Sequence, residues 1–251
     1  MWGIIPAAGK GSRIQPLAFS KELLPMSGSV DGDLRRPRAV SDYLMERFAL
    51  AGARRICIVI SPDKADILEY YGGSAWSASI CYAVQQRPDG LCDAIFRALL
   101  VIEPDAPVVV GLPDTIWFPA DALSELPDDR FSFLLFPVAN PQLFDSVECD
   151  QEGRVTAIRV KEATAVSHWI WGAFKMQGST LRELFDLWNR RDRKDEYIGT
   201  LVNAWLEQGG EAWGVRAGQS YFDVGTMDGY LEAMRSLVEK TRETSVGRQV
   251  A

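Results

Sequence analysis

The chain has 251 residues, of which 47% are hydrophobic and 24% are charged, proportions typical of a soluble globular protein. Its formal net charge of −7 argues against nonspecific nucleic-acid binding, which needs excess basic residues to neutralise phosphates. The sequence has no apolar run of about 18 residues that could span a membrane and no signal-peptide pattern at its start. We therefore expect a cytoplasmic protein without a nucleic-acid or membrane partner.

The first half of the chain alternates strand and helix signals. The run RICIVI at 55–60 is almost continuously apolar, as expected for a strand that is covered on both sides. This alternation predicts a parallel sheet with helices on both faces, with ligands beyond the carboxyl ends of its strands. The expected strands are 3–6, 55–60, 80–84 and 108–111, and the expected helices are 41–51, 65–71 and 90–102.

The second half is more mixed and predicts antiparallel pairing. Two strands around a glycine turn at 150–153 predict a hairpin. We expect a single-domain α/β fold, a Rossmann-like mixed sheet flanked by helices, over 1–236, followed by a polar tail, 237–251. The expected strands are 131–138, 146–149, 155–160, 170–176 and 211–215, and the expected helices are 180–189, 198–207 and 227–244.

The polar segment 27–38, which ends in three arginines, interrupts the pattern. It is either a mobile loop near a site or a plain surface insertion.

Cysteine and histidine are sparse. Cys57, Cys81, Cys92 and Cys149 form no C-x-x-C pair, and His168 is the only histidine. Free thiols are therefore expected rather than disulfides or a zinc site. For His168 we expect a structural role.

The most informative segment is the small-residue loop 7–12 that follows the first strand. Glycines let backbone approach a ligand closely, and successive N–H groups in such a loop form an anion site. A helix that starts nearby would add its positive end. Arg13 and Lys21 add a planar fork and a point charge, two complementary ways to hold phosphate oxygens. The segment fits neither a Walker loop, because Gly11 follows Lys10, nor a dinucleotide fingerprint, because position 14 is Ile.

This segment resembles the signature of the sugar-1-phosphate nucleotidyltransferases, G-x-G-[ST]-R-[LIM]-x-P-L-T followed by K-x-L-[LV]-P. Residues 9–18 and 21–25 follow it, with Ala18 in place of Thr. The resemblance implies the nucleotide-diphosphosugar transferase fold and the reaction of a sugar 1-phosphate with a nucleoside triphosphate, dTTP or UTP, to give a nucleotide-sugar and pyrophosphate. Arg13 and Lys21 would be catalytic, and the nucleotide would bind Ala8, Gly9, Gly11 and Ser12.

Two aspartates are candidates for holding Mg²⁺, the cofactor that we expect for nucleotidyl transfer. Asp114 follows the apolar strand 108–111, where the resembled family has L-G-D, and Asp223 stands in Asp-Val-Gly-Thr, close to the family's W-x-D-[TV]-G-T. Each alone could be a turn or cap residue. Together, in family order, they predict a metal site.

A third segment, QQRPDGL at 85–91, resembles the family's Q-x-x-P-x-G-[LT]. By that resemblance Gln85 would read the base edge and Gly90 would let the base lie against backbone. The thymidylyl branch usually has Gln where this chain has Asp93. A plain polar turn before a helix is the alternative.

The predicted sugar side departs most from the family. Lys161 would seat the sugar phosphate but lacks its usual neighbours, and Asp145 stands where the family has a glycine facing the sugar. The family's [VT]-G-[IL]-Y becomes Trp171-Gly172-Ala173-Phe174, which keeps the glycine and places Trp171 at the sugar side, although Trp169 and Trp171 could equally be core. A carboxylate there predicts an acceptor with an amino group.

Two other functions stay open. One is a cytidylyltransferase that acts on a non-sugar phosphate such as phosphocholine. The other is a nucleotide-sugar-binding subunit without activity, against which the presence of Arg13, Lys21, Asp114 and Asp223 speaks. A nucleotide-dependent dehydrogenase is disfavoured by the missing third glycine. A homo-oligomer also stays open.

Overall fold

The computed structural model describes residues 1–27 and 37–249, with side chains described as far as residue 239. Most of the segment 27–38, including two of its three arginines, therefore lies outside the described residues. None of the helices in the described residues combines the length and the hydrophobicity that a membrane span requires.

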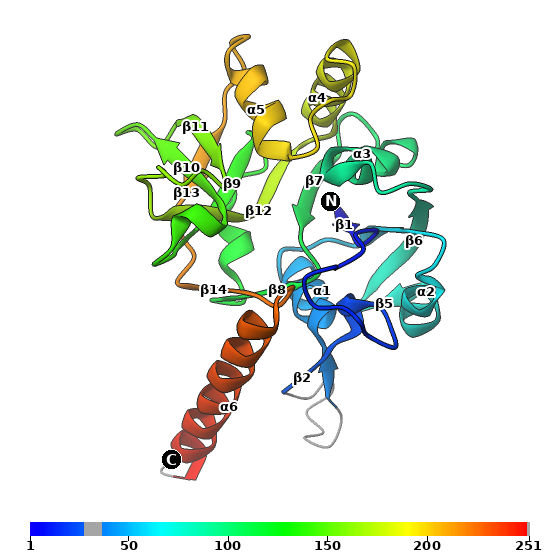
Figure 1. Ribbon diagram of the computed structural model, residues 1–251, viewed down its shortest axis with the longest axis vertical. Helices are drawn as coiled ribbons and strands as arrows, with labels where there is room; N and C mark the ends of the chain where they lie inside the picture. Colours follow the sequence, from blue (N-terminus) through cyan, green and yellow to red (C-terminus); the bar gives the residue numbers. More distant parts are fainter. Residues whose placement is uncertain (28–36, 250–251) are drawn as a thin grey trace.

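A central sheet organises the molecule (Figure 1). Four strands from the first half of the chain lie side by side and parallel, in the order β7-β1-β4-β6. A short strand, β5 (Ser74–Ala75), pairs antiparallel with β6 at the edge. The parallel strands are β1 (Trp2–Pro6), β4 (Arg55–Ile60), β6 (Ala78–Val84) and β7 (Pro107–Gly111).

Strands from the second half extend this sheet. The long strand β12 (Trp169–Gln177) pairs antiparallel with β7 and so joins the two halves of the chain. The predicted hairpin of β10 and β11 is present and antiparallel. The remaining strands are β9 (Ser132–Pro137), β10 (Asp145–Cys149), β11 (Val155–Val160) and β13 (Trp213–Val215). The predicted α/β fold, with a mixed central sheet flanked by helices, is confirmed.

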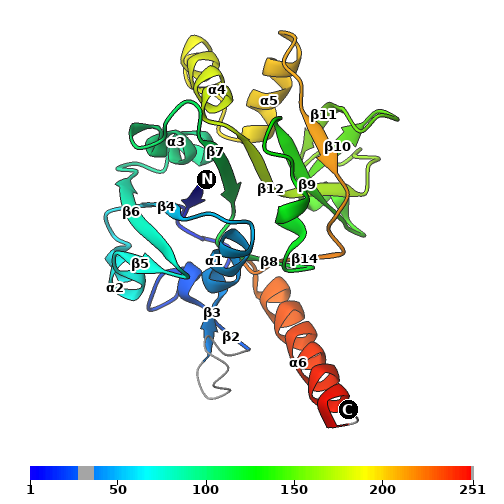
Figure 2. The ribbon, with the colours of Figure 1, turned by 180° about the vertical axis from the view of Figure 1, so that it is seen from behind.

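Helices cover both faces because the strands are apolar on both sides. Successive side chains of a strand point to opposite faces, and Ile4 and Ile5 accordingly belong to two different core clusters. The first cluster includes side chains of α3 (Gly90–Arg97), α4 (Gly178–Arg190) and α5 (Ile198–Leu206), and the second includes those of α1 (Val40–Leu50) and α2 (Ala65–Tyr71). Figure 2 shows the same layers from behind.

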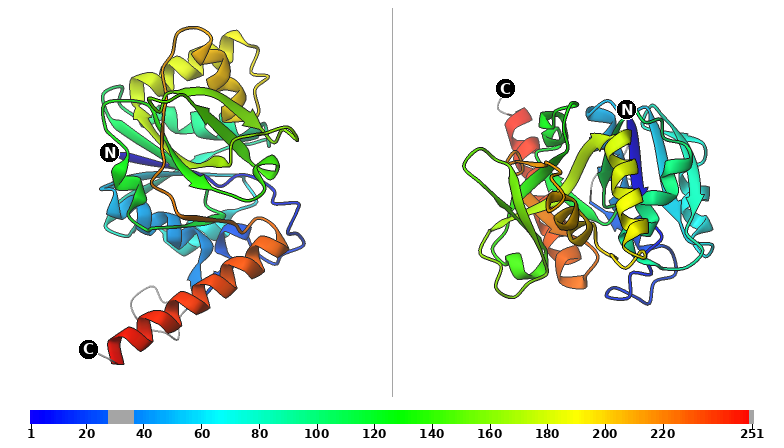
Figure 3. Two further views of the ribbon diagram at one scale, coloured as in Figure 1. Left: turned by 90° about the vertical axis from the view of Figure 1, so that its left-hand side faces the viewer. Right: turned by 90° about the horizontal axis from the view of Figure 1, so that it is seen from above.

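The last helix, α6 (Met227–Gln249), projects from the body (Figure 3). Its first turns pack in a third apolar cluster beside two small pairs of strands. One pair is β2 (Pro25–Met26) with β3 (Arg38–Ala39), and the other is β8 (Thr115–Phe118) with β14 (Ser220–Asp223).

The sequence analysis differs from the structure in several elements. The expected helix 90–102 ends at Arg97 and continues only as a 3-10 turn, Ala98–Leu100. The closing helix runs beyond the expected end at 244. The pair β8 and β14 was not predicted, and it matters for the site because Asp223 ends β14. The four cysteines are free, as expected, and the ring of His168 bonds the Val138 carbonyl.

Candidate active site

The opening loop leaves β1 at the carboxyl edge of the parallel strands. The N–H of Ala7 still donates to the Val59 carbonyl, 2.8 Å away, after which the backbone turns outward. Ala8 is buried, whereas Gly9 and Ser12 are exposed. A turn follows the loop and the next helical residues are the 3-10 turn Lys21–Leu23. The expected helix N-terminus next to the loop is therefore absent in the described residues, and backbone N–H groups and side chains alone would bind an anion.

Position 11 requires a glycine because the side chain of Lys21 packs directly against it. Its φ is +63°, and a Cβ at this position would lie 2.6 Å from Cδ of Lys21. A side chain would therefore both strain the backbone and displace Lys21. A Cβ added at Gly9 would have no atom within 4 Å. The space next to Gly9 is therefore open to a ligand.

Lys21 and Asp114 form an ion pair. The Nζ lies 2.5 Å from Oδ2, and each side chain is only 13% exposed. Burial raises the pKa of Asp114, but the charge and hydrogen bond of Lys21 outweigh it, so the pKa lies below its usual range. Burial lowers the pKa of Lys21, but Asp114 and Glu22 raise it more, so the pKa lies above its usual range. Both groups are therefore charged near neutral pH.

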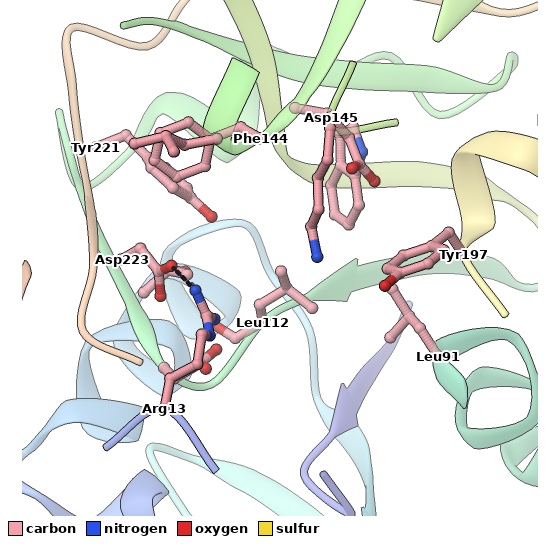
Figure 4. Close-up of a pocket in the computed structure, with 13 residues that line it drawn as sticks. Arg13, Leu91, Leu112, Phe144, Asp145, Tyr197, Tyr221 and Asp223 are labelled. Atoms are coloured by element: carbon pink, nitrogen blue, oxygen red, sulfur yellow. Dashed lines mark hydrogen bonds and ion pairs between the residues drawn. The ribbon is translucent and has the colours of Figure 1, made fainter. Parts of the chain in front are cut away.

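Arg13 forms a second ion pair, with Asp223, at 3.1 Å (Figure 4). The small sheet explains the meeting of these chain segments. In β14 and β8, Asp223 lies opposite Thr115, so Asp223 comes beside Asp114. The two predicted metal ligands are thus neighbours, although they are distant in sequence.

Gly225 shows how closely these groups converge. A Cβ at this position would lie 2.9 Å from Asp114 Oδ2, 2.9 Å from Asp223 Oδ1 and 3.2 Å from an Arg13 nitrogen. Because both carboxylate oxygens lie 2.9 Å from the same Cβ position, the distance between them is at most twice 2.9 Å. Only a residue without a side chain leaves the space between them open.

This pair of carboxylates fits Mg²⁺. No group of three or more His, Cys, Asp or Glu side chains suited to a metal ion occurs in the described part of the chain. Magnesium, however, commonly takes one or two carboxylates and completes its shell with water and substrate phosphates. Asp114 and Asp223 would hold the ion, and phosphate oxygens would supply further ligands.

A cleft separates this charged group from a second wall, which contains Asp145, Lys161 and Trp171 of the predicted sugar side (Figure 4). Lys161 has φ +50° at the end of β11, and its Nζ lies 4.7 Å from the centre of the Tyr197 ring. The cleft is lined by Arg13, Leu91, Leu112, Asp114, Thr115, Leu143, Phe144, Asp145, Lys161, Trp171, Tyr197, Tyr221 and Asp223.

Asp145 is the unusual member of this wall. Its Oδ1 is buried without a hydrogen-bond partner among the described residues, and so is the indole nitrogen of Trp171. Burial raises the pKa of Asp145, while the charge of Lys161 acts against this rise. Trp171 is both core and cleft wall, since it is 5% exposed within the first core cluster.

Gly172 does not line the cleft. A Cβ there would lie 2.6 Å from the Phe136 ring and 2.8 Å from the Tyr221 ring. It occupies a bulge, between Trp171 and Ala173, in the pairing of β12 with β9. Its position lets Tyr221 pack inward, and its predicted contact with substrate stays a prediction.

Gln85 and Gly90 also lie outside the cleft lining. Gln85 is 3% exposed, and its Nε2 donates to the Gly90 carbonyl at 3.0 Å and to Asp93 at 2.8 Å. A Cβ on Gly90, whose φ is +93°, would lie 2.8 Å from Cα of Glu196. Gly90 is therefore required by protein packing, whatever ligand it also meets, and the base-reading role of Gln85 stays a prediction.

Sequence reasoning missed the aromatic lining, above all Tyr197 and Tyr221. Tyr221 could have been found, because it precedes Asp223 by two residues on one strand and so shares its face. Tyr197 carried no such signal, since it stands in a polar run before α5.

Comparisons with known proteins identify the family of the chain. The chain matches the nucleotidyl transferase family over residues 2–240. It is 27% identical to a glucose-1-phosphate thymidylyltransferase of Mycolicibacterium smegmatis, over 93% of this chain and 81% of the relative. A UTP–glucose-1-phosphate uridylyltransferase of Haloferax volcanii is 22% identical over 98% of this chain and 100% of its own. The solved UTP-bound UGPase of Acinetobacter baumannii has the same fold, with a TM-score of 0.76, 18% identity and 98% of both chains covered.

The family match and the named relatives identify a nucleotide-transferring enzyme. The chain belongs to the nucleotidyl transferase family, as a sugar-1-phosphate nucleotidyltransferase.

Proposed function

We propose that this enzyme transfers a nucleotidyl group from dTTP or UTP to a sugar 1-phosphate and releases pyrophosphate, with Mg²⁺ as cofactor. The observation that carries the proposal is the convergence of Arg13, Asp114 and Asp223 on one wall of the cleft that Lys161 also lines, with Lys21 in an ion pair with Asp114. Two phosphorylated substrates need positive charge on both sides of the reacting phosphorus.

The reaction needs position and charge neutralisation more than covalent chemistry. A phosphate oxygen of the acceptor attacks the α-phosphorus in line, and the bond to the β-phosphate oxygen breaks as pyrophosphate leaves. Arg13 and Lys21 neutralise the leaving pyrophosphate, and Lys161 holds the acceptor phosphate. Bound Mg²⁺ supplies Lewis-acid stabilisation of phosphate charge, and Asp114 and Asp223 would hold it. Arg13 and Lys21 are both paired with aspartates in this structure. When the triphosphate binds, its oxygens would replace the aspartates as partners of the two cations, and the aspartates would be free to hold the metal.

The nucleotide would lie against Ala8, Gly9, Gly11 and Ser12. Gln85 would read the base edge through its Oε1, because its Nε2 is committed to Gly90 and Asp93. An acceptor atom suits the ring N–H of thymine and uracil.

A second candidate follows from the acceptor side. Asp145 shares the cleft lining with the aromatic rings of Trp171, Tyr197 and Tyr221, a setting that suits an organic cation. A phosphorylated amine such as phosphocholine would fit this chemistry, with CTP as donor.

The test is pyrophosphate release by the purified chain with Mg²⁺, each of the four common triphosphates and a panel of acceptors. Glucose 1-phosphate with dTTP or UTP should give the nucleotide-sugar, identified by mass. Turnover only with CTP and phosphocholine would favour the second candidate. Tight binding of nucleotide-sugars without turnover of any pair would favour a binding subunit.

A further inference from the structure

Two buried charged side chains lie directly behind the opening loop, and neither lines the cleft. Glu22 is 1% exposed and Lys64 is 6% exposed. The Lys64 Nζ lies 2.8 Å from both carboxylate oxygens of Glu22 and 2.7 Å from the Ala7 carbonyl. One ammonium thus joins the first residue of the loop to the residue after Lys21.

The other side of Lys21 is held from the same short segment. Asp66, two residues after Lys64, accepts hydrogen bonds from the backbone N–H and the hydroxyl of Ser20, each at 2.6 Å. The Glu22 carbonyl in turn accepts a bond from the Ser41 hydroxyl at 2.6 Å. Ser20 is therefore fixed by Asp66, and Glu22 is fixed by Lys64 at the start of α2 and by Ser41 of α1.

A buried ion pair is a costly way to gain stability, because desolvation of the two charges offsets much of their attraction. An apolar pair of similar size would serve packing alone. The partners that Lys64 contacts are instead the two chain segments that supply the phosphate-binding groups, the loop after Ala7 and Lys21. Its contacts set the distance between these segments.

We propose that Lys64 and Glu22 are positioning residues that fix Lys21 and the loop 8–12 relative to each other for nucleotidyl transfer. The inference rests on the proposed function, because it assigns the triphosphate to that loop and that lysine. With the pair in place, Lys21 approaches the phosphates from a set position across Gly11. Without it, the ends of the loop lose their common anchor, while every group that touches substrate remains present.

The test uses the double variant E22Q/K64M, which removes both charges with little change of volume and leaves no unpaired buried ion. The matched control is Lys175→Met. Lys175 is also a buried lysine, 5% exposed, whose Nζ donates to a backbone carbonyl, that of Leu126, at 2.9 Å. It lies on β12, away from the loop. Both variants lose a buried ammonium, and only the double variant loses the anchor.

We expect the double variant to fold, with a kcat reduced by about tenfold or more, since small misplacement of a catalytic group is costly. Its affinity for inorganic tripolyphosphate, measured by calorimetry, should fall by a similar factor. Lys175→Met should lose thermal stability and keep both values. If the double variant unfolds, Glu22→Asp decides, because it keeps both charges and the bond of Lys64 to Ala7 but shortens the side chain that reaches Lys64; an intermediate loss is then expected.

A folded double variant with wild-type kcat and tripolyphosphate affinity would overturn the inference, and so would an equal loss in Lys175→Met. These results differ from failure of the proposed function. In that case the wild-type chain itself would release no pyrophosphate with any triphosphate and acceptor.

Discussion

The guanidinium of Arg13 lies 3.1 Å from the carboxylate of Asp223, although 210 residues separate them in the sequence. The contact joins the opening loop to the end of β14 and places a cation and a carboxylate at the mouth of one cleft. In the proposed reaction, Arg13 would exchange this carboxylate for a phosphate group, and Asp223 would exchange the guanidinium for the metal ion.

Removal of metal should abolish activity. With EDTA, pyrophosphate release should vanish, and it should return when Mg²⁺ is added in excess. Asp223→Asn should lower turnover by orders of magnitude, since one of two metal-holding carboxylates is lost, while the melting temperature stays near that of the wild type. Full turnover in chelator would contradict the two-aspartate site.

Arg13→Ala should lower kcat more than it weakens nucleotide binding. Hydrogen bonds to charged groups contribute about 1.5–3 kcal/mol, and negative charge on the leaving pyrophosphate grows in the transition state. Steady-state kinetics and nucleotide titration on the same preparation separate the two effects. Unchanged turnover would mean that Arg13 serves only to pair with Asp223.

The ion pair of Lys21 and Asp114 should make stability depend on pH in acid. The pKa of Asp114 is lower in the folded protein than in the unfolded chain. Its contribution is therefore fully present above the unfolded value of about 3.9 and is lost as the pH falls through the lower folded value. Urea unfolding of the wild type and Asp114→Asn between neutral pH and about pH 3 should show a stability gap that narrows toward acid. A gap that widens toward acid would contradict the direction of the shift.

The two glycines of the loop should respond differently to alanine. Gly11→Ala forces a side chain into positive φ against Lys21, at a backbone cost of about 1–2 kcal/mol, and should also lower kcat. Gly9→Ala meets no atom within 4 Å and should leave the free energy of unfolding unchanged. Denaturant unfolding of both variants checks the contrast, and equal destabilisation would mean that Lys21 yields to the added methyl.

Much of this could be predicted from the sequence, because the signals were local. The apolar run RICIVI indicated a strand buried on both faces, and the spacing of Gly11, Arg13 and Lys21 indicated an anion site. What the sequence did not reveal depends on contacts between distant segments. β8 and β14 are four-residue strands that form only by pairing with each other, and the pairing of Glu22 with Lys64 links residues 42 apart.

The acceptor should be selected by Asp145. Its Oδ1 is buried without a hydrogen-bond partner among the described residues, and a buried polar group needs one. A sugar hydroxyl can donate to it, and an amino group would do so with charge assistance. Specificity constants for glucose 1-phosphate and for amino-bearing acceptors should therefore favour the latter in the wild type.

In Asp145→Gly the preference should shift toward glucose 1-phosphate, because the carboxylate is gone and the cleft has the glycine of the resembled family. Asp145→Asn is the matched control, since it keeps the volume and can still accept a hydrogen bond but has no charge. If glucose 1-phosphate is the best acceptor in all three proteins, Asp145 does not select the substrate.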